Sequence, residues 1–582
     1  MNKNLLFFFF LYFHIYVYCQ KENKNIPTQE LTVVKSYMPS VSNKNKIRSK
    51  VSSSFLDLSS NSSITYELIQ IPVLSTFKPN KASPLTLQRN SSRNSGFNNH
   101  VDFAFGNLNQ FNFDSSNSFR FDKFQSLNID IVSANFGNIE SSIVNSDQSL
   151  FLFGLNHLYS SNKYEAVHAF KVRSSKDNYY GIYTESDILT DPLLLNRVNT
   201  EQNRTEINFL SNWKFYNKLF KTISFDFNSN FDSFDSSEQF IKINGDILFS
   251  IFNSNFLVSP EYEFISSNFS QGYQNRNSIH SYYSKFEIFF QLSNLLDKFR
   301  YQIGARFNYI TNVSNIPIPQ VFLNPEILIS YGDNGSKLQT YLSLTGGIDL
   351  NSYNKLSYLN PYLSPTLNLM PTQNLYDGKF GLKSSLTSRI ELSFGVHFNS
   401  KKNTFLFKRN PYDNTVVNDG YRLANSFGLV YDDIDKYGIY SELNFRYNDE
   451  NTFKFLFINY NYNLKEMMIP WNLPDFESSI VLKMRIKEKF NLNFNGRLLG
   501  DRPSAYRSVF LNQNIDNSPS VLRNLSILTQ IKTELNYRFV DKLQTYLRMQ
   551  FNFGKDMNQW DYYTINNNLL IAGIRYSFDL TF

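Results

Sequence analysis

The C-terminal stretch IAGIRYSFDLTF, residues 571–582, decides the fold. Large apolar side chains alternate in it with small or polar ones, so the two sets lie on opposite faces of an extended strand. A chain end is usually frayed and polar, so neighbouring strands must hold an aromatic strand at this place. Apolar residues towards lipid and polar residues towards a wet lumen are the pattern of a membrane β-barrel. The apolar set is Ile574, Tyr576, Phe578, Leu580 and Phe582, and the other set is Gly573, Arg575, Ser577, Asp579 and Thr581.

The same alternation recurs along the chain from about residue 100. It is clearest at residues 101–106, 223–228, 301–309 and 390–398. No amphipathic stretch at helical spacing competes with these strands. No segment after the N-terminus has the run of roughly 18 apolar residues that a membrane helix needs. Since every backbone N–H and C=O group in lipid needs a partner within the protein, such strands can cross a bilayer only as a closed barrel.

Composition agrees with alternating strands rather than with an ordinary soluble core. Of 582 residues, 57 are Phe and 37 are Tyr, yet the hydrophobic fraction is only 42%. A chain that is polar on average but rich in large apolar side chains is expected when the two kinds alternate. The net charge of +7 is spread without a long basic run, so we expect no nucleic-acid partner.

Residues 1–19 have the features of a secretory signal peptide. Lys3 supplies the positive charge, and the apolar run at residues 5–18 is too short to span a bilayer as a helix. We expect cleavage after Cys19, which leaves Gln20 as the mature N-terminus and removes the only cysteine. The alternative is lipoprotein processing at Cys19 itself, which bulky Tyr18 directly before it disfavours.

Residues 20–98 form a distinct region rich in Ser, Asn and Lys. Two patterned pieces stand out, ELTVVKSYMP at residues 30–39 and IQIPVLSTFKP at residues 69–79. Val- and Ile-rich pieces that end in Pro are often edge strands. The region is therefore either an extended, mostly irregular leader or a periplasmic or lumen-associated segment that docks on something.

Short and long connections alternate in the C-terminal third. A strand at residues 480–487 ends in a tight Lys-Glu-Lys turn before a strand at 490–499, and a long polar loop follows. A strand at 525–539 is joined by a short turn to its partner at 545–553, and another long loop leads to the final strand. Bacterial barrels alternate tight periplasmic turns with long extracellular loops in this way.

The predicted fold is therefore all-β: a large antiparallel transmembrane β-barrel over residues 99–582. At about ten residues per strand it holds roughly 16–22 strands. Residues 399–435 are the least determined part, because they fit either an extra hairpin or a single extracellular excursion.

The C-terminal half resembles the barrel domain of TonB-dependent outer-membrane receptors, especially plain barrel proteins of Bacteroidetes. The resemblance rests on LVYDDIDKYGIYSELNFRYND at residues 429–449, MIPWNLPDF at 468–476 and MNQWDYYTINNNLLIAGIRYSF at 557–578. It implies a barrel in the cell outer membrane that moves a bulky solute, powered through the TonB complex. Receptors of this family also carry a folded plug domain, which residues 20–98 are too short to supply, so TonB-driven transport rests on the resemblance alone.

No pattern in the sequence predicts an active site, so we expect no enzyme, no cofactor and no metal. Neither a G-x-S-x-G elbow nor a Gly-rich phosphate loop is present. The histidines do not have metal-binding spacing such as H-E-x-x-H, and scattered lumen or loop positions explain them. They are His14, His100, His157, His168, His280 and His397.

Two further groups allow a functional and a structural interpretation. Asp432, Asp433 and Asp435 could bind calcium through carboxylate oxygens, but without EF-hand spacing a solvated turn is favoured. Aromatic loop residues could stack on a sugar or anchor at the membrane interface, where Tyr and Trp are enriched, and the second interpretation is favoured. These aromatic residues are Trp471, Trp560, Tyr562 and Tyr563.

Two classes of function follow from the predicted barrel. One is a transporter or pore in the outer membrane, with a wide polar lumen as the path of an unidentified solute. The other is a non-transporting anchor that presents surface loops or a periplasmic segment to a partner protein. Outer-membrane lipid is a partner in both cases.

Overall fold

The computed structural model describes residues 98–579 except 182–197, 218, 252–253, 276, 297, 314–315, 317, 333–336, 412, 414–418, 506–521 and 556. The signal peptide at residues 1–19, nearly all of the region at 20–98 and the last residues of the C-terminal stretch therefore lie outside the described residues.

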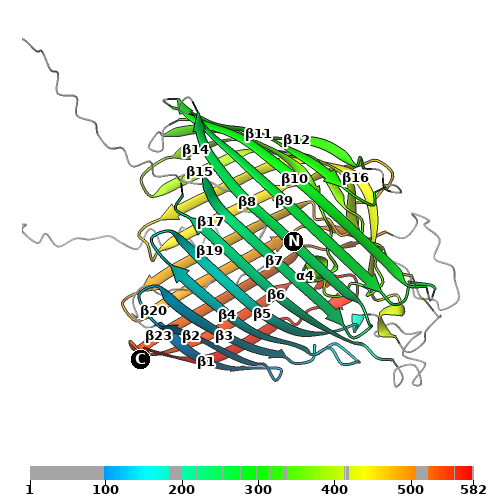
Figure 1. Ribbon diagram of the computed structural model, residues 1–582. Helices are drawn as coiled ribbons and strands as arrows, with labels where there is room; N and C mark the ends of the chain where they lie inside the picture. The colour runs from blue at the N-terminus through cyan, green and yellow to red at the C-terminus, as the bar shows by residue number, and fades with distance from the viewer. Residues whose placement is uncertain are drawn as a thin grey trace, which may run out of the picture. The chain divides into compact units, whose positions relative to one another are not determined.

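Strands dominate the described chain (Figure 1). Two small hairpins, β21 Arg502–Ala505 with β22 Leu522–Leu525 and β25 Asn558–Trp560 with β26 Tyr563–Thr564, lie in loops, as do helix α4 Tyr353–Leu359 and 3-10 helix η3 Gly420–Arg422. The strands of the main sheet are β1 Asn99–Gly106, β2 Phe111–Arg120, β3 Gln125–Phe136, β4 Gln148–Ser160, β5 Tyr164–Asn178, β6 Glu201–Phe215, β7 Phe220–Asp232, β8 Ser237–Ile251, β9 Ser254–Phe269, β10 Ile279–Leu296, β11 Phe299–Ile310, β12 Val321–Tyr331, β13 Leu338–Asp349, β14 Thr372–Ser385, β15 Ile390–Arg409, β16 Phe427–Arg446, β17 Thr452–Asn459, β18 Asn461–Leu464, β19 Phe476–Ile486, β20 Phe490–Leu499, β23 Leu528–Val540, β24 Leu543–Phe553 and β27 Asn568–Phe578.

The main sheet is a closed antiparallel barrel in which each strand pairs with the next one along the chain. β17 and β18 both pair with β16 and are separated only by Tyr460, so they are two halves of one barrel strand. The barrel therefore has 22 strands, at the upper limit of the predicted number. Both the fold class and the antiparallel topology predicted from the sequence are confirmed.

The final strand closes the barrel, because β27 pairs with β24 on one side and with β1 on the other. On its luminal face Asp102 accepts hydrogen bonds from Tyr546 Oη at 2.5 Å and from Arg575 Nε at 2.9 Å. The ring of Tyr546 covers Gly573, where an added Cβ would overlap it. The expectation that neighbouring strands hold the C-terminal strand is confirmed.

The two faces of the barrel differ as the alternation predicts. On the outer face, Phe103, Ile303 and Ile574 are 48%, 47% and 53% exposed, and many other large apolar side chains share this exposure. On the inner face lie polar residues such as Asp102, which is 3% exposed. A continuous apolar surface of this size would associate or aggregate in water, so the outer face belongs in a bilayer.

Connection lengths sort to the two ends of the barrel. The turns that follow the even-numbered strands β2 to β16, and those after β19 and β23, are short. They lie at the end where β1 begins and β27 ends, which we call the turn end. Most connections at the opposite end, the loop end, are long. They include residues 179–200, 350–371, 410–426, 500–527 and 554–567. The alternation predicted in the C-terminal third thus extends around the barrel (Figure 1).

The structure bears on two further expectations from the sequence, one about residues 399–435 and one about helices. The stretch at residues 399–435 holds no extra barrel strand, because β15 and β16 extend into it and leave residues 410–426 as one excursion. The expectation that no stretch at helical spacing competes with the strands agrees with the described residues, where α4, with Tyr353 and Leu356 buried, is a seven-residue helix in a loop. Among the described residues, no helix is both long and apolar enough to cross a bilayer.

Candidate ligand pocket under the loops

The long loops meet in one buried cluster at the loop end, which we call the mouth cluster. Twenty-two strands about 4.8 Å apart and tilted by about 40° give a barrel roughly 44 Å across. Loops from well-separated parts of this ring can meet only by reaching across the mouth. The buried members of the cluster are Tyr179, Tyr180, Phe269, Tyr353, Leu356, Tyr362, Leu363, Leu367, Leu369, Tyr421, Phe427 and Tyr563.

The loop at residues 350–371 is the centre of the mouth cluster. Ser352 caps α4 by accepting a hydrogen bond from Lys355 N at 3.3 Å. Glu238 of β8 in turn accepts a hydrogen bond from Ser352 Oγ at 2.5 Å. It also accepts the backbone N–H groups of Tyr353 at 2.6 Å and Asn354 at 3.1 Å. Since these N–H groups have no partner within the helix, one buried carboxylate of the barrel wall anchors the loop.

Other walls of the barrel hold the same loop. The hydroxyl of Tyr180, just after β5, lies 3.3 Å from that of Tyr362. The ring of Tyr563, from the loop between β24 and β27, stacks on Tyr362. At β16, Phe427 O accepts a hydrogen bond from Ser364 N at 2.9 Å. Three sectors of the ring are thereby joined through one loop.

A second anchor lies in the loop between β15 and β16. Arg422 of η3 is fully buried and forms an ion pair with Asp413. It also donates hydrogen bonds to Gly272 O at 3.2 Å and to Gln271 Oε1 at 2.9 Å, both in the loop after β9. An arginine that pairs in this way ties two loops together.

A pocket of about 310 Å³ lies between the mouth cluster and the luminal wall of β4, β5 and β6. Six of the residues that line this pocket are arginines, an aspartate and tyrosines. They are Arg173, Asp177, Tyr180, Arg204, Tyr358 and Tyr362. Its volume is at the lower end of the range of small-molecule sites.

The two arginines of the pocket differ in their contacts. Arg204 pairs with Asp177 Oδ2 at 3.0 Å and donates to Pro361 O at 2.7 Å, so it joins the wall to the loop. The guanidinium of Arg173 lies over the ring of Tyr358 at 4.3 Å. Among the described residues no carboxylate forms an ion pair with Arg173, so the pocket holds a cation that a ligand anion can approach.

The tyrosines of the pocket stay neutral. Burial raises the pKa of Tyr362 well above its ordinary value, and the neighbouring hydroxyl of Tyr180 adds to the shift. Burial also raises the pKa of Tyr180 and of Tyr358, and nearby Glu206 adds to the shift of Tyr358. Neutral phenols donate hydrogen bonds, and two of them are already engaged, since Tyr180 donates to Thr564 O at 2.9 Å and Tyr358 donates to Glu206.

The candidate histidines do not come together. His100 pairs with Asp114 at 2.9 Å on the luminal side of β1 and β2. His157 and His168 stack on each other across β4 and β5, on the outer face. His397 Nε2 lies 3.0 Å from Asn459 O, far along the ring. Within the described ranges, no three His, Cys, Asp or Glu residues are arranged to hold a metal ion, and His14 lies outside these ranges.

The acidic run does not form the solvated turn that we expected, because it lies within β16. Asp432 is 4% exposed and accepts hydrogen bonds from Glu466 N at 3.0 Å and Met467 N at 2.8 Å. Asp435 accepts one from Ser400 Oγ at 2.6 Å. Asp432 thus ties the loop after β18 to β16, whereas Asp435 joins β16 to β15, and strand alternation alone reveals neither role.

Of the four aromatic loop residues, Tyr563 belongs to the mouth cluster and Trp560 packs against it, so these two are not anchors at the membrane interface. Tyr563 is fully buried, and Trp560 packs edge-on against Phe427 at 5.3 Å. Trp471 lies elsewhere, under Lys408 at 5.6 Å. Sequence reasoning missed the loop at residues 350–371, although LNSYNKLSYLNPYLSPTLNLMP is more apolar than a solvated loop would be.

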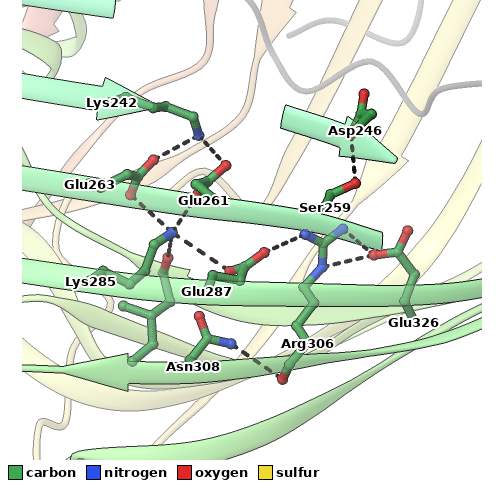
Figure 2. A network of polar contacts seen from close by, with 11 residues as sticks. Lys242, Asp246, Ser259, Glu261, Glu263, Lys285, Glu287, Arg306, Asn308 and Glu326 are labelled. Atoms are coloured by element: carbon green, nitrogen blue, oxygen red, sulfur yellow. Dashed lines mark hydrogen bonds and ion pairs between the residues drawn. The ribbon is translucent and has the colours of Figure 1, made fainter. Parts of the chain in front are cut away.

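The luminal wall of β8 to β12 carries a continuous ion-pair network (Figure 2). Its centre is Lys285 Nζ, which lies 3.0 Å from Glu261 Oε1 and 2.9 Å from Glu263 Oε2. The network joins three cations and four glutamates along five strands, so its charges largely cancel. In order around the wall its members are Lys242, Glu261, Glu263, Lys285, Glu287, Arg306 and Glu326.

No protein-family model matches this chain, and no curated protein sequence matches it. Solved structures do share its fold. The siderophore receptor PirA from Acinetobacter baumannii is 11% identical, over 82% of this chain and 80% of that one, with a TM-score of 0.60. The FrpB iron transporter from Neisseria meningitidis is 9% identical, over 83% and 81%, with a TM-score of 0.58. The copper transporter OprC is also 9% identical, over 83% and 80%, with a TM-score of 0.56. The chain thus has the barrel fold of large receptors and metal transporters.

Proposed function

We propose that the protein is an outer-membrane transporter of the TonB-dependent type. The solute enters at the loop end and leaves at the turn end, which faces the periplasm in barrels of this topology. The observation that carries the proposal is the pocket inside the ring, where Arg173 and Arg204 face loops that close over them. A ligand bound in this pocket already lies inside the ring that the barrel wall encloses.

The pocket also suggests how binding and opening are connected. Arg204 holds Asp177 on the wall and Pro361 on the central loop at the same time. A solute anion that competes for this guanidinium weakens the tie between wall and loop. Binding energy is then available to shift the mouth cluster towards an open state.

The energy source and the solute class come from likeness alone. Similarity to TonB-dependent receptors makes the TonB complex the expected partner. Because the similar solved structures are a siderophore receptor and transporters of iron and copper, a metal chelate is the first solute to test.

The packing of the mouth cluster favours a second candidate, a non-transporting anchor. Loops that share a buried core, such as Tyr353, Tyr421 and Tyr563, form a firm surface for a partner protein. If the protein is such an anchor, removal of the loop at residues 350–371 opens no path through the barrel.

Planar-bilayer recordings of the full chain distinguish the two candidates. Replacing residues 350–371 by a short Gly-Ser linker should turn a closed barrel into a conducting one. The matched control replaces residues 465–475, a loop outside the buried members of the mouth cluster, and should leave the barrel closed. Lack of conductance after removal of the central loop would refute the transporter and favour the anchor.

Two further measurements test the remaining parts of the proposal. Fractionation of cells that express the full chain should recover it with outer-membrane lipid. Pull-down with the C-terminal domain of TonB should retain the full chain, and failure to do so would contradict energised transport while leaving an open pore possible.

A further inference from the structure

Charged residues are unevenly distributed around the lumen. On the luminal face of β1 to β12, carboxylates outnumber lysines and arginines. On the luminal face of β14 to β24 the order is reversed, and basic residues outnumber acidic ones. The lumen therefore has one acidic and one basic wall, on opposite sides of the ring.

The carboxylates of the acidic wall have local partners. The network around Lys285 pairs four glutamates with three cations (Figure 2). Asp130 accepts hydrogen bonds from Ser116 Oγ at 2.5 Å and from Asn156 Nδ2 at 3.0 Å. Asp246 accepts one from Ser259 Oγ at 2.5 Å. These groups are satisfied within the wall.

The basic wall differs, because six of its lysines have no such partners. Its carboxylates are largely engaged with other residues: Glu391 pairs with Lys383, Glu477 with Arg497 and Glu534 with Arg548. Six luminal lysines on β14, β15, β16, β17, β19 and β23 form no ion pair with any carboxylate in the described part of the chain. They are Lys379, Lys401, Lys436, Lys454, Lys483 and Lys532, which we call the lysine wall.

Three members of the lysine wall lie close together. Lys379 is opposite His397 and Lys436 is opposite Asn399, two residues further along β15, while Lys401 follows on the same face. Directly opposed residues are about 5 Å apart and diagonal neighbours about 7–8 Å. The nearest carboxylate in this register is Asp377, also opposite Asn399, so three cations share one anion.

The other members continue the wall towards the turn end. Lys454 of β17 and Lys483 of β19 lie near the short turns, and both are exposed to the lumen. Lys532 of β23 is exposed halfway along its strand. Together the lysines line the path from below the loops to the periplasmic rim.

A surface that carries one sign of charge raises the local concentration of counter-ions. Rings or rows of Lys and Arg are the means by which pores select anions and phosphates. We infer that the lysine wall is a binding and conduction surface for multiply charged anions that carry phosphate or carboxylate groups. The inference rests on the proposed transport function and adds to it the charge class of the solute.

Isothermal titration of the purified full chain with inorganic pyrophosphate, and separately with citrate, tests the inference. We expect binding that weakens as salt is added, because the contacts are between exposed charges. The double substitution of Lys379→Gln with Lys436→Gln should weaken binding on the order of tenfold. A second pair, Lys454→Gln with Lys483→Gln, should weaken it independently at the turn end.

The matched control is Lys171→Gln on β5. Lys171 is also luminal, exposed and without an ion pair among the described residues, but it lies on the acidic wall. It should change the affinity less than twofold, and heat-modifiable mobility on gels should show that every variant is folded. Binding of either anion with this pattern supports the inference. Absence of binding by the unaltered chain, or equal loss in the Lys171 variant, overturns it.

The outcome is separable from that of the proposed function. Binding at equilibrium needs no transport, so a lysine wall that binds pyrophosphate in a barrel that never conducts leaves the binding part of this inference standing and refutes the transporter. A barrel that conducts after loop removal but binds neither pyrophosphate nor citrate supports the transporter and overturns this inference.

Discussion

Glu238→Gln should loosen the central loop of the mouth cluster. The carboxylate of Glu238 accepts four hydrogen bonds, from Ser267 Oγ and Ser352 Oγ and from the backbone N–H groups of Tyr353 and Asn354. A glutamine of the same shape has one amide oxygen, which can accept about two hydrogen bonds. Two of the four buried donors then lose their partner, either Ser352 Oγ and Asn354 N or Ser267 Oγ and Tyr353 N.

Each unsatisfied buried donor costs about 1–3 kcal/mol. Part of this cost is recovered when the loop shifts, so we expect local opening of residues 353–363 to become easier by about 2–4 kcal/mol. Hydrogen exchange of their amides should accelerate by roughly 30- to 900-fold. Strand amides of the barrel should exchange as before, because the barrel ladder does not depend on this loop.

Hydrogen-exchange mass spectrometry of the full chain measures this effect. Asp246→Asn is the matched control, since Asp246 is a luminal carboxylate of the same strand that bonds Thr222 and Ser259 but not the loop. If exchange at residues 353–363 is unchanged in the Glu238 variant, or rises as much in the control, Glu238 does not anchor the loop.

Three further predictions concern the wall, the seam and the pH response. Lys285→Met leaves three luminal glutamates without their central cation and should cost about 3–5 kcal/mol in urea unfolding from lipid vesicles, whereas Lys214→Met, at an exposed 3.9 Å pair, should cost less than about 1 kcal/mol. Equal losses of stability in the Lys285 and Lys214 variants would show that the ion-pair network does not stabilise the barrel. Gly573→Ala should overlap the Tyr546 ring and cost about 1–3 kcal/mol, measured as impaired refolding on gels, whereas Gly347→Ala meets no atom within 4 Å and should refold normally. The tyrosines of the mouth cluster have pKa values raised by burial, so their contribution to stability is complete below pH 10 and is lost as pH rises further. Absorbance at 295 nm should show a set of phenols that ionise only on alkaline unfolding; a single transition near pH 10 in the folded protein would argue against their burial.

The barrel itself could be predicted because strand period and lipid impose it locally. The faces of residues 571–578 follow from alternation alone, and the strand at Phe490–Leu499 has the bounds that the sequence predicts. The candidate site could not be predicted in this way. Glu238 and Ser352 are far apart in the sequence, and nothing in either segment shows that one anchors the other. The same holds for Arg173, Arg204 and Tyr358, which only the closed ring brings together.

What the sequence by itself determined is the closed antiparallel barrel, its polar lumen and the alternation of short turns with long loops. These follow from a period of two residues and from the need to pair every backbone group in lipid. Tertiary structure decided the rest. The number of strands, the mouth cluster, the pocket and the lysine wall depend on which strands face each other across the lumen. That relation is set by ring closure at β1 and β27, which no local pattern encodes.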